Sequence, residues 1–159
     1  MEYQVNINYE LSAESEAEAR EKARDYINTN LKVKPKNCTI SPEEIAKRCR
    51  DFRKKKKEHF CVFFLNSQNN ILGREIVSIG TLNASIIHPR ESFRKAVQKC
   101  ANSVIFVHNH PSGGLTPSAE DIATTHRLKD AGKILGIEVL DHIIVTKEQY
   151  YSLKQAELI

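Results

Sequence analysis

After residue 40, apolar and polar positions follow patterns that predict five strands. The dense apolar run 59–65 and the mixed run 71–80, separated by a polar turn at 66–70, predict the two strands of a hairpin. Three more short apolar runs predict further strands at 84–87, 103–107 and 139–145. Because helical segments separate these runs, we expect a mixed β-sheet flanked by helices, an α/β fold.

Apolar residues at helical spacing predict helices between these strands. The helices are expected from Pro42 through the basic run 47–57, over 89–101, from Pro117 or Ser118 to Leu135, and near 148–154. Ser41, Pro42 and Glu44 combine a cap, a first-turn proline and an acid at the reciprocal position. Gly136 is expected to stop the long helix. The apolar residues expected to face inward are Ile45, Cys49 and Phe52 in the first helix, and Phe93, Ala96, Val97 and Cys100 in the second.

The first 40 residues have a different organisation. Residues 3–9 alternate as in a half-buried strand, a helix capped by Ser12 or Ser15 is expected to run to Asn30, and 31–40 form a connector. One strand and one helix cannot bury a core of their own. We therefore expect residues 1–40 to be a strand–helix appendage and residues 41–159 to be the main domain.

Composition excludes several classes of protein. With 159 residues, 40% hydrophobic and 28% charged, the chain falls in the globular range. Its longest apolar runs are far shorter than the ~18 residues of a membrane span, and its first residues lack the pattern of a signal peptide, so a cytoplasmic protein with no membrane contact is expected. The four cysteines form no CxxC pair, so we expect them to be free, with Cys61 in the core.

Positive charge is concentrated in one segment. Residues 47–57 hold eight basic residues and one acid, a net charge of +7, although the whole chain carries only +4. We expect a solvated helix end that makes at most weak, sequence-independent contacts with nucleic acid. The residues available for those contacts are Arg48, Arg50, Arg53, Lys54, Lys55, Lys56 and Lys57.

The segment 108–121 contains the most specific chemical pattern. His108 and His110 are two apart at the end of an apolar strand, so their imidazoles should share a face. Pro111 should end the strand, and the following loop could return Asp121 to the same place. Two histidines, one carboxylate and a water form a layout typical of catalytic zinc. Each part also has a structural interpretation, since a His-x-His pair is often superficial and Ser118-x-x-Asp121 is an ordinary helix cap.

The joint spacing resembles a known family. H-x-H, seven residues, then S-x-x-D is the metal motif of the JAB/MPN (JAMM) metalloproteases, and HPRE, HNHPSG, TPS-x-x-D and LDHIIV in this order are similar to the RadC branch. The resemblance runs from about Ser41 to the last residue. It implies a cytidine-deaminase-like fold, one zinc ion per chain held by His108, His110 and Asp121, and a protein or peptide substrate.

The resemblance also implies two catalytic residues. The family uses a Glu directly before an apolar strand as general base, and Glu58 occupies that place. Glu91 is the second choice, although a first-turn acid has an adequate structural reason, and Glu75 is a weaker third. Ser118 matches the family serine that can stabilise an oxyanion, and it can also cap the helix that carries Asp121.

The remaining polar residues of note have weaker assignments. His88 and Arg90 belong to the RadC-like signature, without a role that can be derived. For Asp141 and His142, a core polar pair is preferred over support for the metal site. His126 is expected in solvent, and His59 on the strand face opposite Glu58.

Three functions compete. The first is a zinc-dependent metallopeptidase or isopeptidase. The second is a RadC-type DNA-repair-associated protein that binds DNA through the basic segment, although the helix-hairpin-helix-like region of longer RadC proteins is replaced here by the strand–helix segment. The third is a metal-binding scaffold without activity. The signatures of zinc deaminases, of H-E-x-x-H proteases and of nucleotide-binding loops are absent, and the oligomeric state stays open.

Overall fold

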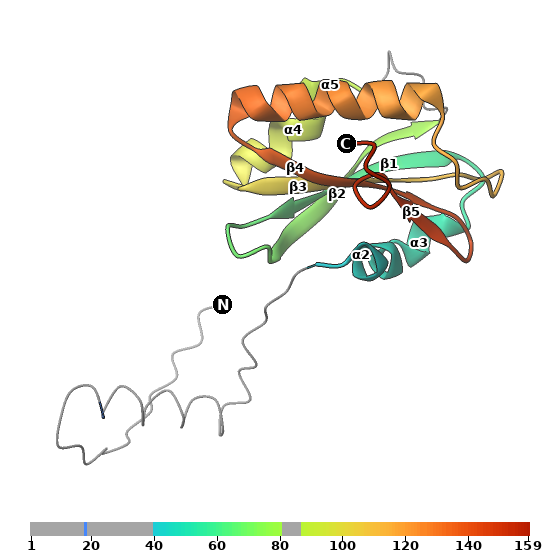
Figure 1. The fold of residues 1–159 in the computed structure, drawn as a ribbon, viewed down its shortest axis with the longest axis horizontal. Helices are drawn as coiled ribbons and strands as arrows, with labels where there is room; N and C mark the ends of the chain where they lie inside the picture. Colours follow the sequence, from blue (N-terminus) through green and yellow to red (C-terminus); the bar gives the residue numbers. More distant parts are fainter. Residues whose placement is uncertain (1–17, 19–39, 81–86) are drawn as a thin grey trace. The chain divides into compact units, whose positions relative to one another are not determined.

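A computed structural model of the chain describes Glu18 and residues 40–80 and 87–159 (Figure 1). The strand, helix and connector predicted for residues 1–40 therefore lie almost entirely outside the described residues, and the domain boundary at residue 40 stays a prediction. The strand predicted for 84–87 also falls outside them, except for Ile87, which is buried and belongs to no strand.

The described strands form one mixed sheet. Its members are β1 (Glu58–Leu65), β2 (Ile71–Gly80), β3 (Ser103–Asn109), β4 (Glu138–Val145) and β5 (Tyr150–Ser152). Their order in space is β2-β1-β3-β4-β5. β3 and β4 are parallel, and the other neighbours are antiparallel. The α/β class and the β1–β2 hairpin predicted from the sequence are thus confirmed.

Helices cover both faces of this sheet (Figure 1). On one face, α4 (Pro89–Gln98) and α5 (Ala119–Leu135) pack on a cluster that includes Phe60, Val62 and Phe106. On the other face, α2 (Pro42–Arg48) packs on a cluster that includes Cys61 and Phe63, and the short α3 (Arg50–Arg53) follows it. Because successive strand residues point to opposite faces, the apolar run of β1 supplies both layers.

Local capping signals set the helix ends where the sequence indicated. The Ser41 side chain accepts a hydrogen bond from the backbone N–H of Glu44 at 3.2 Å, which starts α2. Ser118 caps α5 in the same way, and Gly136 ends α5 in the left-handed conformation with a φ of 68°. These caps place Asp121 in the first turn of α5.

The apolar face predicted for the first helix is confirmed where the structure describes it. Ile45 and Cys49 are both fully buried. The side chain of Phe52 lies outside the described part of the chain, so its inward position stays a prediction.

Three sequence predictions about the helices are wrong. Residues 148–154 do not form a helix, because Tyr150–Ser152 pair with β4 as the edge strand β5 after a turn closed by the Thr146 N–H to the Gln149 carbonyl at 3.0 Å. In α4, Phe93 and Ala96 are buried, but Val97 is 56% exposed, since the buried arc of the helix runs from Ser92 to Phe93 and Val97 lies beyond its Phe93 edge. Cys100 is exposed because α4 ends before it.

The basic run is also not the end of one helix. The first helix breaks at Cys49, α3 ends at Arg53, and residues 54–57 form the connection to β1. The Lys57 carbonyl accepts a hydrogen bond from the Asn109 amide at 3.2 Å and lies 2.8 Å from the His59 ring. These contacts hold the segment in an irregular loop that connects α3 to β1.

Two expectations drawn from composition can be compared with the described residues. Cys49, Cys61 and Cys100 are free, and Cys61 is fully buried in the core, as predicted. Among the described helices, none has the length and apolar character needed to cross a membrane.

Candidate metal centre

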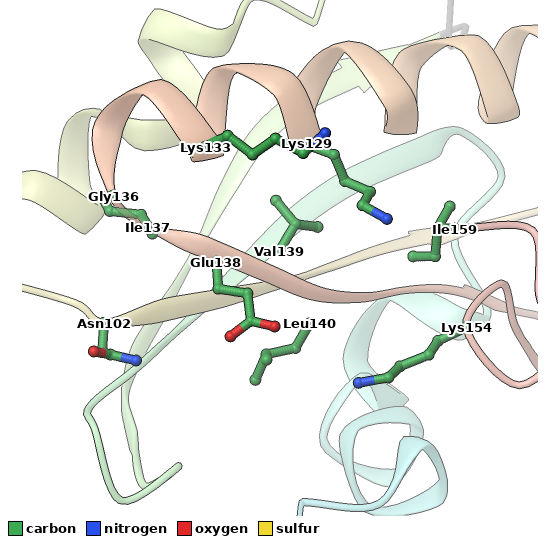
Figure 2. A pocket seen from close by; sticks show the side chains of 11 residues that line it. Asn102, Lys129, Lys133, Gly136, Ile137, Glu138, Val139, Leu140, Lys154 and Ile159 are labelled. Atoms are coloured by element: carbon green, nitrogen blue, oxygen red, sulfur yellow. The ribbon is translucent and has the colours of Figure 1, made fainter.

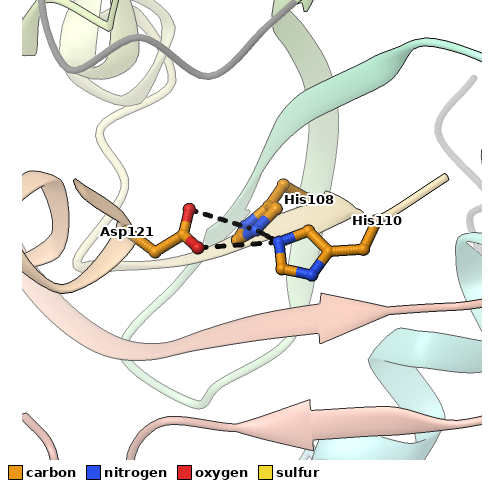
Figure 3. A group of neighbouring side chains, drawn as sticks. All are labelled: His108, His110 and Asp121. Atoms are coloured by element: carbon orange, nitrogen blue, oxygen red, sulfur yellow. Dashed lines mark hydrogen bonds and ion pairs between the residues drawn. The ribbon is translucent and has the colours of Figure 1, made fainter. Parts of the chain in front are cut away.

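β3 and α5 bring three potential ligands together at one end of the sheet (Figure 3). His108 is on β3, His110 follows that strand and extends its pairing through its N–H to the Val145 carbonyl at 3.0 Å, and Asp121 is on α5. One side-chain ligand atom from each residue lies within 4.8 Å of the other two. His108 and Asp121 are buried, and His110 is partly buried. The predicted ligand residues are therefore neighbours in space.

The ligand atoms converge closely. His108 Nε2 lies 2.9 Å from His110 Nε2 and 3.3 Å from Asp121 Oδ1. His110 Nε2 lies 3.5 Å from Asp121 Oδ2. Two imidazole nitrogens and a carboxylate at this separation can share one cation.

A chain of hydrogen bonds assigns the protons on His108. The Asp121 carbonyl can only accept, so the Thr125 hydroxyl, 2.6 Å away, donates to it. The Thr125 oxygen then accepts from His142 Nδ1 at 2.5 Å, which leaves His142 Nε2 to accept from His108 Nδ1 at 2.8 Å. Consequently His108 Nε2 presents a lone pair to the site. Burial, which lowers the pKa of His142 to about 4, keeps that ring neutral as the chain requires.

His110 presents the same kind of atom. Its Nδ1 donates to the Gly114 carbonyl at 2.8 Å, so a neutral ring directs its Nε2 lone pair at that of His108. Facing lone pairs repel unless a positive charge lies between them. The hydrogen bond with Asp121, aided by Gly114 and by the charges of Asp121 and Glu58, accordingly raises the pKa of His110 against the effect of burial. The site is built to hold positive charge, whether a proton or a metal ion.

Asp121 is held as a carboxylate by its neighbours. Burial acts to raise its pKa, but hydrogen bonds from His110 and Ser118 outweigh that effect and hold the pKa well below its usual range. The Ser118 backbone N–H and hydroxyl donate to Oδ2 at 2.8 and 2.7 Å, and the Asp121 N–H donates back to the Ser118 oxygen at 3.1 Å. The predicted capping role of Ser118 is confirmed by this capping box.

The donor set fits a metal ion. Two neutral imidazole nitrogens and one ionised carboxylate are the ligands that zinc accepts at catalytic sites. The second nitrogen of each histidine is engaged by the protein, as is usual behind metal-bound histidines. His108, His110 and Asp121 can therefore hold a metal ion.

Glu58 lies on the face of the sheet that carries the ligands. It is the first residue of β1, and Phe60, two positions later, is paired with His108. Side chains two positions apart share a face. The Glu58 carboxylate also contributes to the raised pKa of His110, after the larger effect of the hydrogen bond to Asp121. This register and this charge effect place Glu58 near the ligand group.

The two alternative bases are engaged elsewhere. Glu75 on β2 forms an ion pair with Arg94 at 3.2 Å. Glu91, in the first turn of α4, pairs with Arg90 at 3.3 Å and approaches Arg94 at 3.9 Å. Both carboxylates thus belong to an ion-pair group centred on α4.

The side chains of Asp141 and His142 lie on opposite faces of β4, and the His142 backbone N–H donates to Asp141 Oδ1 at 2.7 Å. Asp141 fastens the segment after β4, accepting hydrogen bonds from the Ser152 hydroxyl at 2.6 Å and the Lys154 N–H at 3.1 Å. His142 faces the other side, against the Phe60 ring and His108. The sequence-based preference for a structural role fits Asp141. It missed the contact between His142 and His108, a candidate ligand. Because side chains alternate between the two faces of a strand, the predicted strand 139–145 already indicated that Asp141 and His142 point in opposite directions.

The other polar residues lie as follows. His126 is exposed, as predicted, and His88 and Arg90 are also exposed. His59 alternates with Phe60 and so lies on the α2 face, opposite Glu58, as predicted. Asn109, which the sequence reasoning missed, is fully buried and accepts a hydrogen bond from the His59 N–H at 2.7 Å. A polar residue between two candidate ligands was the only local hint of its role.

A mixed sheet with helices on both faces, His-x-His at the end of a central strand and Asp in the first turn of the next helix are the features of a JAB/MPN domain with a group that could hold a metal ion. Within that class, the chain belongs to the RadC-like JAB domain family, whose sequence profile matches residues 39–158. The family predicted from the sequence is thereby confirmed.

Curated relatives carry the name UPF0758 protein. One from Desulforamulus reducens is 54% identical over 109 residues, covering 69% of this chain and 48% of the relative. One from Desulfitobacterium hafniense is 45% identical over 138 residues, covering 86% of this chain and 60% of the relative. One from Methanosarcina acetivorans is 50% identical over 121 residues, covering 76% of this chain and 53% of the relative. The chain thus spans about half the length of the curated relatives it matches.

Proposed function

We propose that this chain is a zinc-dependent hydrolase of amide bonds, a metallopeptidase or isopeptidase. The observation that carries the proposal is the convergence of two Nε2 lone pairs and the Asp121 carboxylate on one point, with Glu58 on the same face of the sheet. Three ligand atoms that can share one cation, with a carboxylate on the same face of the sheet, are the groups that a metal-dependent hydrolase needs. Membership of a family that includes hydrolases supports the same function.

His108, His110 and Asp121 would hold the zinc ion. When bound at such a site, zinc lowers the pKa of a coordinated water towards about 7 and polarises a carbonyl oxygen. Glu58 is proposed as the general base, because a carboxylate beside the ligand group can accept a proton from water and deliver it to the leaving amine.

Ser118 has one role in the structure and a second in the proposal. Its hydroxyl now donates to the Asp121 carboxylate at 2.7 Å, which orients that ligand. Rotation of the hydroxyl would let it donate to the oxyanion that develops on the substrate carbonyl. Removal of Ser118 should therefore weaken both metal binding and catalysis.

The test compares Glu58→Gln with Glu91→Gln. The two changes are matched, because each replaces an acid at the start of an element with its amide: Glu58 begins β1, and Glu91 lies in the first turn of α4. Zinc-loaded full-length protein is assayed against quenched peptides and ε-linked lysine isopeptides, and metal content is measured by mass spectrometry. Glu58→Gln should keep its zinc and lose activity by at least ~10²-fold, as expected for a lost acid–base group. Glu91→Gln should stay close to the wild type.

Other outcomes would overturn specific parts. An inactive Glu91→Gln beside an active Glu58→Gln would move the base to α4. Full zinc content in both His108→Ala and Asp121→Ala would refute the ligand assignment. A wild-type protein that binds zinc but cleaves nothing in the panel would leave the metal-binding scaffold as the function.

A further inference from the structure

A basic cleft adjoins the candidate metal centre. It has a volume of about 580 Å³ and is lined by three segments, 53–56, 110–113 and 146–149. The first is part of the basic run, the second begins with His110, and the third is the turn between β4 and β5. One wall of this cleft therefore includes a candidate metal ligand.

The cations of the cleft are not neutralised by the part of the chain that the structure describes. Earlier in the basic run, Lys47 pairs with Glu43 at 2.6 Å and Arg48 with Glu44 at 3.0 Å, while Asp51 pairs with Arg74 at 2.7 Å. No described acid forms an ion pair with the five cations of the cleft, which are Arg53, Lys54, Lys55, Lys56 and Lys147. Among the described lining residues, Glu148 is the one acid. The cleft therefore has a strong excess of positive charge.

Asn109 ties this charge to the metal centre. Its buried side-chain amide donates to the carbonyl of Lys57 at 3.2 Å and of Lys55 at 3.5 Å, and its oxygen accepts from the His59 N–H at 2.7 Å. Asn109 lies between His108 and His110 in the sequence. The basic segment is thus fastened to the strand that carries two candidate ligands and is not a freely solvated tail.

Arg53 supplies a guanidinium group to the described lining of the cleft. Guanidinium groups bind carboxylates through paired, charge-assisted hydrogen bonds, so a carboxylate is a suitable partner for this residue.

We propose that this cleft binds an acidic stretch of a polypeptide substrate, beside the bond to be cleaved. The inference rests on the proposed amide hydrolase, and it names the class of substrate for that same site. Side-chain carboxylates of Asp and Glu complement the unpaired cations. No Phe, Tyr or Trp is among the described lining residues, so the cleft lacks the platforms on which single-stranded nucleic acids stack their bases.

A second hollow in the same domain supplies a matched control (Figure 2). Its volume is about 530 Å³, and Lys129, Lys133 and Lys154 line it together with Glu138. None of the candidate metal ligands lines it. The rise of an α-helix places Lys133 roughly 18 Å along α5 from Asp121. Neutralising Lys129, Lys133 and Lys154 changes the net charge of the protein by the same amount as neutralising three lysines of the basic cleft, so the two variants differ only in where the charge is lost.

The experiment measures binding without cleavage. Fluorescence anisotropy follows a labelled Glu- and Asp-rich peptide, and its Gln and Asn counterpart, on zinc-loaded full-length Glu58→Gln protein. The acidic peptide should bind at least ~10-fold more tightly than the neutral one, with an affinity that falls as salt rises. Combined Lys54→Gln, Lys55→Gln and Lys56→Gln should remove most of that preference. Combined Lys129→Gln, Lys133→Gln and Lys154→Gln should change it less than ~2-fold.

Three results would overturn the proposal. The first is equal affinity for the acidic and the neutral peptide. The second is an equal loss of affinity for the acidic peptide in the two triple variants. The third is an oligonucleotide that binds more tightly than the acidic peptide and whose binding the cleft triple variant abolishes. The last result would make the cleft a nucleic-acid site. Circular dichroism verifies that both triple variants are folded. Cleavage of peptides with no acidic preference would refute the cleft assignment alone, and acidic preference without any cleavage by the wild type would refute the hydrolase alone.

Discussion

His142 links two candidate metal ligands through hydrogen bonds. From the Asp121 carbonyl, the bonds pass through Thr125 and His142 to His108 Nδ1. Each bond has only one polarity that satisfies every atom, so the chain selects the His108 tautomer that directs Nε2 to the site. A ligand whose tautomer and ring angle are preset loses less freedom when it binds a metal.

We predict that His142→Leu weakens zinc binding by about 10–100-fold, because His108 Nδ1 then loses its acceptor. His142→Gln places an amide oxygen near the Nε2 position and should recover part of the affinity. His126→Ala, on the exposed side of α5, is the control and should bind zinc like the wild type. Competition against a chelating dye measures the three dissociation constants. Wild-type affinity in a folded His142→Leu protein would show that His142 has no positioning role.

Helix α5 connects the site to the fold through its two ends. Its first turn carries Asp121, while its last turns approach β4 closely at Gly132. The Gly132 carbonyl accepts from the Ile137 N–H at 2.9 Å. A Cβ atom at Gly132 would meet the Ile137 carbonyl oxygen at 2.5 Å and side chains of Phe93 and Val139 at 3.3 Å. The helix can lie at this distance from the sheet only because that side chain is absent.

Gly132→Ala should therefore lower the free energy of unfolding by about 1–3 kcal/mol, as overpacking does. This direction opposes intrinsic helix propensity, which favours Ala over Gly by ~1 kcal/mol. Lys133→Ala, an exposed neighbour on the same helix, should stay within about 0.5 kcal/mol of the wild type. Urea denaturation of the metal-free proteins measures both values. A Gly132→Ala protein that is more stable than the wild type would show that propensity outweighs the close contact.

The whole domain is organised as one sheet between two helical layers. Both described core clusters are built from residues 45 onward, with Ile40 at the margin of one of them. The candidate metal ligands, their hydrogen-bonded supports and the basic cleft also belong to this part of the chain. The unit Cys38–Ile159 thus contains a core on each face of the sheet and the complete candidate site.

We predict that a fragment of residues 38–159 unfolds cooperatively and binds zinc as the full chain does. Thermal denaturation followed by circular dichroism, with and without zinc, measures both properties. Zinc at about 100 times its dissociation constant should stabilise each protein by ~2.7 kcal/mol, because the metal binds the folded state. An unfolded or zinc-free fragment would show that residues 1–37 complete the core or the site.

Local signals in the sequence were sufficient for the elements that carry the ligands. β1 and β3 are buried on both faces, so their sequences are nearly continuous apolar runs. Such runs predict strands without knowledge of the neighbouring strands. Ser118 and Gly136 delimit α5 through contacts within four residues of each end. The spacing of His108, His110 and Asp121 along one strand and one helix start was therefore enough to indicate the ligand group.

Long-range contacts determined the rest, because no local pattern encodes them. Tyr150–Ser152 form a strand since β4 offers an open edge, although their spacing also suits a helix. Residues 54–57 leave the helix because Asn109, some fifty residues away, binds the carbonyls of Lys55 and Lys57. His142 reaches His108 because β3 and β4 are parallel neighbours. The pairing of β3 with β4 also brings the β4–β5 turn beside the basic run, so the cleft at the candidate metal centre exists only once the sheet has formed.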